Sequence, residues 1–189
     1  GVRKPKSKLA GGVELFSISN VVYIDGKSDI KTLMSAQLDR HYSHIAEDIS
    51  RSMMAYDVLK YTNAYTESVC ENEYFLLVQD VLAALDDASI APDLTWAWFG
   101  CRLLEISGRA INTVTDTHGQ QLKASDTFGF DYESMSFQPL QNGIYAATHI
   151  KVLRLCLTLH IAQLGSVGGI SDASSAIKKL ITECIKYNK

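Results

Sequence analysis

The chain has 189 residues, of which 47% are apolar and 21% charged, a composition typical of a soluble protein with a buried core. No apolar run approaches the roughly 20 residues that a membrane helix needs, and no secretory leader is visible. The four cysteines are widely spaced, so we expect buried reduced thiols in a cytoplasmic protein rather than a disulfide scaffold.

The formal net charge of −3 is unevenly distributed along the chain. Residues 39–93 hold eleven acidic and three basic residues, a net charge of −8. The first 13 residues have no acidic side chain and carry a charge of +4, from Arg3, Lys4, Lys6 and Lys8. This asymmetry indicates an anionic partner at the N-terminal end. The alternatives for this segment are a disordered arm and a strand with a solvated lysine face.

Short apolar runs between residues 13 and 33 predict β structure. Asp25-Gly26 is a strong turn signal, so we expect strands at about 19–24 and 29–33 joined as a hairpin. The run Ser7–Phe16 is either a short helix or a loop.

From about Ser35 the apolar residues recur at helical spacing. The spacing predicts helices over residues 40–64, 71–87, 94–107 and 146–162, and a last helix that Ser171 caps. The helix at 94–107 is apolar on nearly every side, so we place it at the centre of the core, with Arg102 and Glu105 sharing one edge.

Between these helices lies a region of different character. Residues 109–127 are polar and lack periodicity, whereas Phe128–Tyr132 and Met135–Phe137 predict two short strands. The sequence therefore predicts an α+β chain, in which a small β-rich piece is followed by a helical domain.

Several residue patterns suggest catalysis or metal binding, and none is convincing. His41 and His44, with Asp48 a turn further on, have the spacing of metal ligands, but two solvated histidines on an acidic helix need no metal. Ser175-x-x-Lys178 matches the nucleophile motif of penicillin-binding enzymes without that family's other motifs. We therefore expect no catalytic residue, no cofactor and no enzymatic activity.

Phosphate binding suits the basic N-terminal segment better. Pro5 restricts the backbone between its cations, and neutralised phosphates give an affinity that depends on salt and not on sequence. Other cations are candidates to extend this surface, or are solvated charges and local ion pairs: Arg102, Lys123, Lys151 and Arg154.

Several motifs resemble the RecO family of bacterial recombination mediators. The N-terminal segment, with Leu15-Phe16-Ser17 after it, resembles part of the family's N-terminal domain. The family helix Phe-x-x-Arg-Leu-Leu-Glu-x-x-Gly is matched from Phe99 to Gly108. Phe130–Phe137 resembles the family's next hairpin and Lys151–Arg154 the helix after it, so order and spacing hold over nearly the entire chain.

The resemblance implies an oligonucleotide/oligosaccharide-binding (OB) fold joined to a helical domain. Residues 1–36 would be the C-terminal portion of an incomplete OB domain, and residues 37–189 the helical domain, with a hairpin lobe at about 109–141. Because an OB barrel has five strands, we expect an N-terminally short form that lacks roughly the first forty residues of a typical member.

The resemblance also implies a non-catalytic role in DNA repair and recombination, in the RecF pathway. That role is to bind single- and double-stranded DNA, anneal complementary strands and help load RecA. The implied partners are RecR and the acidic C-terminal tail of the single-stranded-DNA-binding protein, and the implied location is the cytoplasm, at the nucleoid. Residues implied to face DNA are Arg3, Lys4, Lys6 and Lys8. Residues implied to contact DNA or the acidic tail are Arg102, Lys151 and Arg154. The alternative is a non-catalytic adaptor that binds partner peptides through its helical domain.

Many members of the family carry a zinc site, and its ligands are not matched here. The first cysteine pair falls on Thr115 and His118, and the second near Gln138 and Gln141. One ligand of four cannot hold zinc, so we expect no metal. We also expect the lobe to be held by packing alone and to be among the more mobile parts of the domain.

Overall fold

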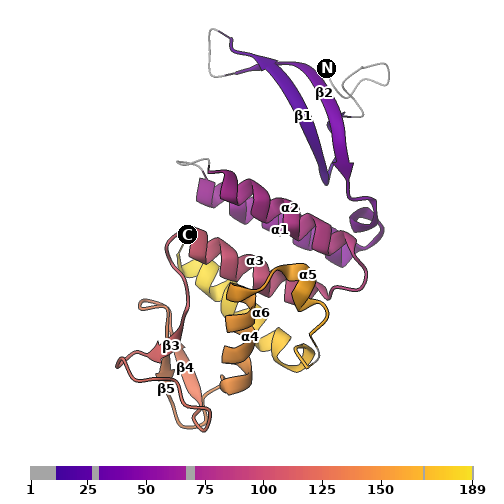
Figure 1. Cartoon of the computed structure of the whole chain (residues 1–189). Coiled ribbons are helices and arrows are strands. Elements are labelled where there is room, and N and C mark those ends of the chain that lie inside the picture. Colours follow the sequence, from indigo (N-terminus) through magenta and orange to yellow (C-terminus); the bar gives the residue numbers. More distant parts are fainter. Residues whose placement is uncertain (1–11, 27–29, 67–70, 168, 189) are drawn as a thin grey trace.

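The computed structural model describes residues 12–26, 30–66, 71–167 and 169–188, which form an α+β chain (Figure 1). The four candidate DNA-facing residues lie outside the described residues: Arg3, Lys4, Lys6 and Lys8. Among the described helices, none is long and apolar enough to cross a bilayer.

An antiparallel hairpin of β1 (Ser17–Ile24) and β2 (Thr32–His41) begins the described chain. Figure 1 shows it projecting from the helical body. The predicted hairpin is confirmed, but β2 is longer than expected and ends at His41, inside the predicted helix at 40–64. Pairing with β1 continues to Ser17 opposite His41, and this non-local pairing overrides the local helical spacing. Two strands do not make a five-stranded barrel, and an OB fold is not confirmed.

The predicted helix at 40–64 starts nine residues late. A short 3₁₀ helix, η2 (Ser43–Glu47), precedes α1 (Ile49–Thr66). The Asp48 carboxylate accepts a hydrogen bond from the Arg51 amide at 3.0 Å, which is the contact of an N-cap residue with the first turn of a helix. The capping residue Asp48 therefore sets the start of α1. The apolar periodicity does not set it, because that periodicity continues across the start of the helix.

The other helices lie close to their predicted positions. The next two are α2 (Asn72–Asp86) and α3 (Pro92–Ile106). The predicted helix at 146–162 is divided into α4 (Ala147–Thr158) and α5 (Ile161–Leu164). His160 separates them, since its Nδ1 accepts the Ala162 amide and caps α5. The last helix, α6 (Ser171–Tyr187), begins at Ser171, and Ile170 occupies the N-cap position that we assigned to Ser171.

Helix α3 is at the centre of the core, as predicted, and packs against α1, α2, α4 and α6 (Figure 1). Both of its indole N–H groups donate a hydrogen bond. Trp98 donates to the Leu159 carbonyl at 2.9 Å, and Trp96 donates to the Thr182 hydroxyl at 3.0 Å. Gly100 brings α6 close, because a Cβ at this position would lie 2.0 Å from Ile181 Cγ2. The core helix is therefore fixed by close packing and by two directed hydrogen bonds.

A three-stranded sheet forms the lobe after α3. The strands are β3 (Asn112–Asp116), β4 (Phe128–Asp131) and β5 (Ser136–Pro139), in the order β3-β5-β4. Strands β4 and β5 are the predicted pair, whereas β3 falls in the stretch that we predicted to be an irregular loop. The rings of Phe128 and Phe137 are buried in this lobe.

Candidate functional site

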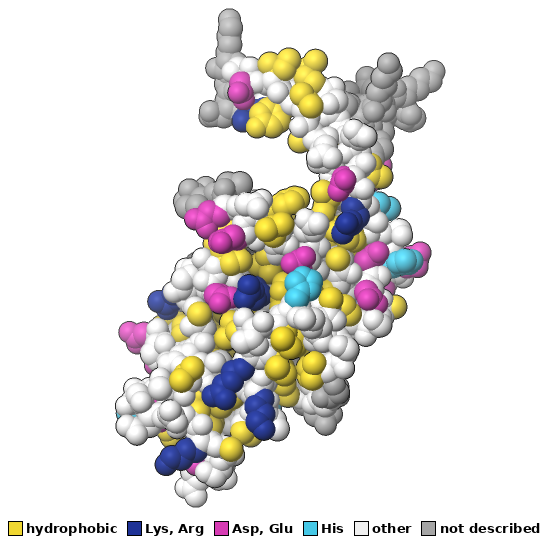
Figure 2. All heavy atoms as spheres, in the orientation of Figure 1, with side chains coloured by type: hydrophobic (Ala, Val, Ile, Leu, Met, Phe, Trp, Pro, Cys, Tyr) yellow, Lys and Arg dark blue, Asp and Glu magenta, His cyan; other side chains and the backbone are white. Residues whose placement is uncertain are grey.

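The structure places the four described candidate cations on two separate surfaces. Arg102 lies on α3 and borders a groove of about 580 Å³, which we call the α3 groove. Lys151 and Arg154 lie on α4 and line, with Lys123, a small pocket of about 60 Å³ next to the lobe, which we call the basic pocket. Lys and Arg side chains gather at the lower end of the face shown in Figure 2, over α4 and the lobe.

The positive charge of the basic pocket is not neutralised by ion pairs among the described residues. Arg154 is positioned by two hydrogen bonds to the Thr113 carbonyl, from Nε at 3.0 Å and from Nη2 at 2.5 Å. Both bonds use one edge of the guanidinium, and Nη1 has no partner among the described residues. Within the described ranges, no carboxylate forms an ion pair with Lys123, Lys151 or Arg154. Lys and Arg side chains without an ion-pair partner can bind phosphate groups.

Arg102, in contrast, is already partnered. Its Nη1 lies 2.6 Å from a Glu105 carboxylate oxygen and donates to the Leu157 carbonyl at 3.1 Å. The predicted pairing of Arg102 and Glu105 on one edge of α3 is therefore confirmed. An anionic ligand at Arg102 must compete with this carboxylate.

The patterns that suggested catalysis or metal binding do not assemble. His41 ends β2 and its Nδ1 lies 2.8 Å from the Ser17 hydroxyl, whereas His44 lies in η2 and pairs with Asp86 at 3.5 Å. Lys178 of the Ser-x-x-Lys motif forms an ion pair with Asp93 at 2.7 Å. In the part of the chain that the structure describes, no group of three or more His, Cys, Asp and Glu residues could hold a metal ion.

The turn where a zinc ligand pair would stand is closed by a carboxylate. Asp116 Oδ1 accepts the amides of His118 at 2.8 Å and Gln120 at 2.9 Å. The Thr115 hydroxyl accepts from the Asn112 amide group at 2.9 Å. Of the four expected ligand positions only His118 carries a zinc ligand, so the residues present do not fit that metal. The lobe is not held by packing alone, because these hydrogen bonds also fix it.

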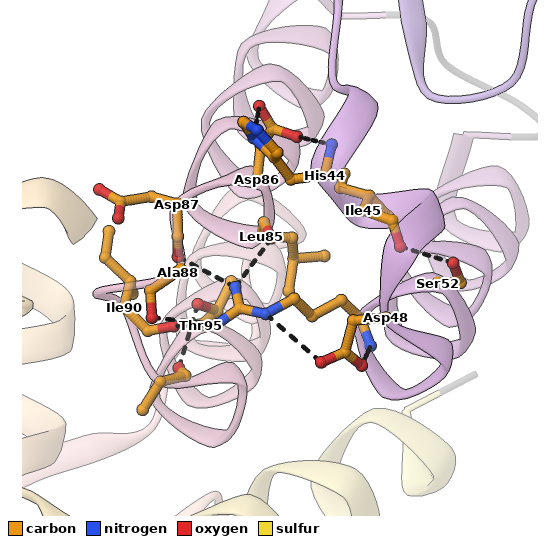
Figure 3. Close-up of polar contacts among 12 residues, drawn as sticks. His44, Ile45, Asp48, Ser52, Leu85, Asp86, Asp87, Ala88, Ile90 and Thr95 are labelled. Atoms are coloured by element: carbon orange, nitrogen blue, oxygen red, sulfur yellow. Dashed lines mark hydrogen bonds and ion pairs between the residues drawn. The ribbon is translucent and has the colours of Figure 1, made fainter.

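A second polar cluster, which the sequence did not reveal, surrounds Arg51. Its guanidinium donates to four carbonyls at and just after the end of α2, those of Leu85 (2.8 Å), Asp87 (3.0 Å), Ala88 (3.4 Å) and Ile90 (3.1 Å). Figure 3 labels the residues of this turn that supply the carbonyls, Leu85, Asp87, Ala88 and Ile90. Helix α2 has no basic residue in its own last turn, so Arg51 supplies the positive charge that its C-terminus favours. This cluster is structural.

Comparisons with known proteins point to one family. No family model matches the chain. The DNA repair protein RecO of Dehalococcoides mccartyi strain 195 is 34% identical over 108 residues, which cover 57% of this chain and 42% of that protein. RecO of D. mccartyi strain CBDB1 is 32% identical over 108 residues, with the same coverage of both proteins. RecO of Moorella thermoacetica is 29% identical over 111 residues, covering 58% of this chain and 40% of that protein. The chain thus spans about two fifths of the length of these relatives. The chain is therefore similar to DNA repair proteins of the RecO family over rather more than half of its own length.

Proposed function

We propose that the chain acts in DNA repair as a non-catalytic protein that binds DNA, anneals complementary strands and helps load RecA onto single strands. The similarity to RecO proteins supports this proposal. The structural observation that carries it is the basic pocket, where Lys123, Lys151 and Arg154 converge without a carboxylate partner among the described residues.

The proposed DNA contact includes the N-terminal segment. Its four cations lie outside the described residues and are assigned from the sequence: Arg3, Lys4, Lys6 and Lys8. For single-stranded DNA each neutralised phosphate adds about −0.7 to the slope of log K against log salt. The four cations would therefore contribute about −2.8, and the three of the basic pocket about −2.1.

The proposal also divides the chain into the C-terminal portion of an OB domain, residues 1–36, and a helical domain, residues 37–189. Exposed apolar side chains on the hairpin support this division, because Val21, Val22, Tyr23 and Ile24 are 49–59% exposed. Further strands of a barrel would cover such residues, and apolar patches of this kind usually mark a contact surface.

RecR and the acidic C-terminal tail of the single-stranded-DNA-binding protein are the partners that we propose. Acidic residues of the tail would be attracted to Lys151 and Arg154, which have no ion-pair partner among the described residues, rather than to Arg102. The tail and DNA would then compete for the same cations. An acidic tail peptide that ends in Asp-Phe should accordingly displace a labelled oligonucleotide from the basic pocket.

Annealing of complementary oligonucleotides across a salt series tests the DNA proposal. We expect the double variant Lys123→Gln/Lys151→Gln to reduce the salt slope of single-strand binding by about 1.4 and to slow annealing at moderate salt. A control is Lys179→Gln, which removes an exposed cation from α6 and should leave the slope unchanged. No binding at low salt, or an equal slope in the double variant and the parent, would count against DNA contact at the basic pocket.

A further inference from the structure

The α3 groove differs from the basic pocket in both shape and charge. It lies between α2, α3 and the segment that links α4 to α5. Its volume of about 580 Å³ is within the range of ligand sites, whereas the basic pocket holds little more than one small group. The DNA proposal makes no use of this groove.

The floor of the α3 groove is apolar and buried. Leu77 and Trp98 line it and are each only 4% exposed. The Trp98 indole N–H is occupied by the Leu159 carbonyl, so the floor presents a ring and aliphatic carbon rather than a free donor. Leu76 stands at the edge and is 48% exposed, which leaves an apolar side chain available for a partner. Such a surface takes a large apolar side chain.

Among the charged residues that line the groove, carboxylates outnumber basic side chains. Three carboxylates line it, from Glu73, Asp80 and Glu105, and Glu105 is compensated by Arg102 at 2.6 Å. Asp80 lies 3.2 Å from His160 Nε2. His160 Nδ1 accepts the Ala162 amide, so Nε2 is the ring nitrogen that faces Asp80.

Glu73 has no hydrogen-bond or ion-pair partner within the described ranges. Two of the three carboxylates of the groove, Glu73 and Asp80, are therefore on α2 and have no Lys or Arg partner among the described residues. Figure 2 shows carboxylates beside a histidine and a basic side chain on the middle of the visible face, above the region where basic residues gather.

Helix geometry places these groups in one stripe. Glu73 and Asp80 are seven residues apart on α2, which is about two turns and about 10 Å along the helix axis. Leu76 and Leu77 lie between them at the spacing of one turn, so apolar surface separates the two carboxylates. An extended peptide covers about 10 Å in about three residues.

We propose that the α3 groove binds a cationic–apolar peptide segment of a partner protein, with Lys or Arg residues about three positions apart and a large apolar residue between them. The cations meet Glu73 and Asp80, and the apolar side chain rests on Leu76 and Trp98. An acidic segment is disfavoured, because it would add negative charge to the groove and would have to displace Glu105 from Arg102. Nucleic acid is disfavoured for the same reason.

Two labelled synthetic peptides test the proposal on the whole chain by fluorescence anisotropy. One is Gly-Lys-Phe-Leu-Lys-Gly and the other has both lysines replaced by glutamate. We expect the cationic peptide to bind, with an affinity that falls as salt rises, and the acidic one not to bind. Equal or tighter binding of the acidic peptide would overturn the proposal.

Substitutions in the groove provide the second arm. Glu73→Gln and Asp80→Asn should each weaken the cationic peptide by about two- to fivefold, the range expected for one exposed ion pair. Leu76→Ala should weaken it by at least about fourfold, the equivalent of one buried methylene. Glu133→Gln, a carboxylate change in the lobe, is the matched control and should have no effect. Unchanged affinity in all three groove variants would rule the site out.

Charge exchange keeps the test decisive if one variant is unstable. The double variant Glu73→Lys/Asp80→Lys should exchange the preference, binding the acidic peptide and not the cationic one.

The chain's own basic N-terminal segment is the competing occupant of the α3 groove. If neutralising Arg3, Lys4, Lys6 and Lys8 tightens peptide binding, that segment fills the groove and the partner proposal is wrong; unchanged affinity supports it. Annealing by Glu73→Gln/Asp80→Asn should equal that of the parent, which separates this proposal from the DNA proposal.

Discussion

Arg51 of α1 donates a hydrogen bond from Nη1 to the carbonyl of Leu85, near the end of α2, at 2.8 Å. A cation supplied by one helix thus satisfies carbonyls that another helix leaves free at its C-terminus. The same guanidinium continues to Asp87, Ala88 and Ile90, so it also fixes the turn that leads into the central helix α3 (Figure 3). Arg51 therefore links α1 directly to the turn between α2 and α3, in addition to the packing of these helices against one another.

Removing this side chain should destabilise the whole fold. We expect Arg51→Ala to lower the free energy of unfolding by about 2–4 kcal/mol, because hydrogen bonds to a charged group are lost and part-buried carbonyls are left unpaired. Arg51→Lys should recover only part of this, since an ammonium group cannot reach four carbonyls in a fork. Chemical denaturation followed by circular dichroism measures both. Lys60→Ala, an exposed cation on the same helix, is the control; an equal loss in that variant would contradict the assignment.

The contact between α3 and α6 makes a second prediction. Gly100→Ala should destabilise the chain by about 1–3 kcal/mol, as overpacking does, because the new Cβ would meet Ile181 Cγ2. Ile181→Ala removes that methyl group and costs stability by itself through a cavity. In the double variant the two effects should be less than additive, which a double-mutant cycle of thermal unfolding would reveal. Full additivity would show that the helices separate freely at this point.

The sequence predicted the central parts of the fold better than its edges. Helix α3 was placed within two residues because Pro92 and Gly108 mark its ends locally. Strand β2 was cut short because the spacing of the apolar residues was interpreted as helical from about Ser35, and only pairing with β1 decides between the two structures. Strand β3 was missed because Asn112–Asp116 has few apolar residues, and its pairing with β5 comes from distant parts of the chain.

The candidate surfaces could be predicted only in part for the same reason. Lys151 and Arg154 are one turn apart, so their common face was predictable, but the contact of Arg154 with Thr113 joins positions 41 residues apart. The carboxylates of the α3 groove gave no sequence signal. Glu73 and Asp80 indicate a binding surface only because the fold places them on the same groove as Arg102 and His160. Arg102 is already paired with Glu105 there.

A turn of the lobe makes a prediction about pH. The hydrogen bond from the Ser134 hydroxyl, and next the backbone amides of Glu133 and Ser134, hold the pKa of Asp131 below its ordinary value. A carboxyl with a lowered pKa stabilises the fold above its unfolded pKa of about 4, and that contribution is lost as pH falls through the folded value. Titration of the carboxyl carbon by NMR should show the shift, and Ser134→Ala should raise the pKa toward normal. A normal pKa in the parent would mean that the turn is open in solution.

The buried thiols make the last prediction. Burial raises the pKa of Cys184 to about 12, and the hydrogen bond with Cys156 together with burial raises that of Cys101 well above its ordinary value. Since the thiolate is the reactive form, neither should react with a thiol reagent at pH 8 in the folded protein. The variant Cys70→Ser limits the count to the three buried thiols, which should react only after denaturation.

The same thiols affect stability at high pH. Unfolded thiols ionise near pH 8.5, whereas Cys184 in the folded chain stays protonated to about 12, so the unfolded state loses protons first and the free energy of unfolding falls over this range. Cys184→Ala should weaken this alkaline loss at the cost of a small cavity. Rapid stoichiometric labelling of the native protein, or an alkaline loss as steep in Cys184→Ala as in the parent, would contradict a buried thiol at this position.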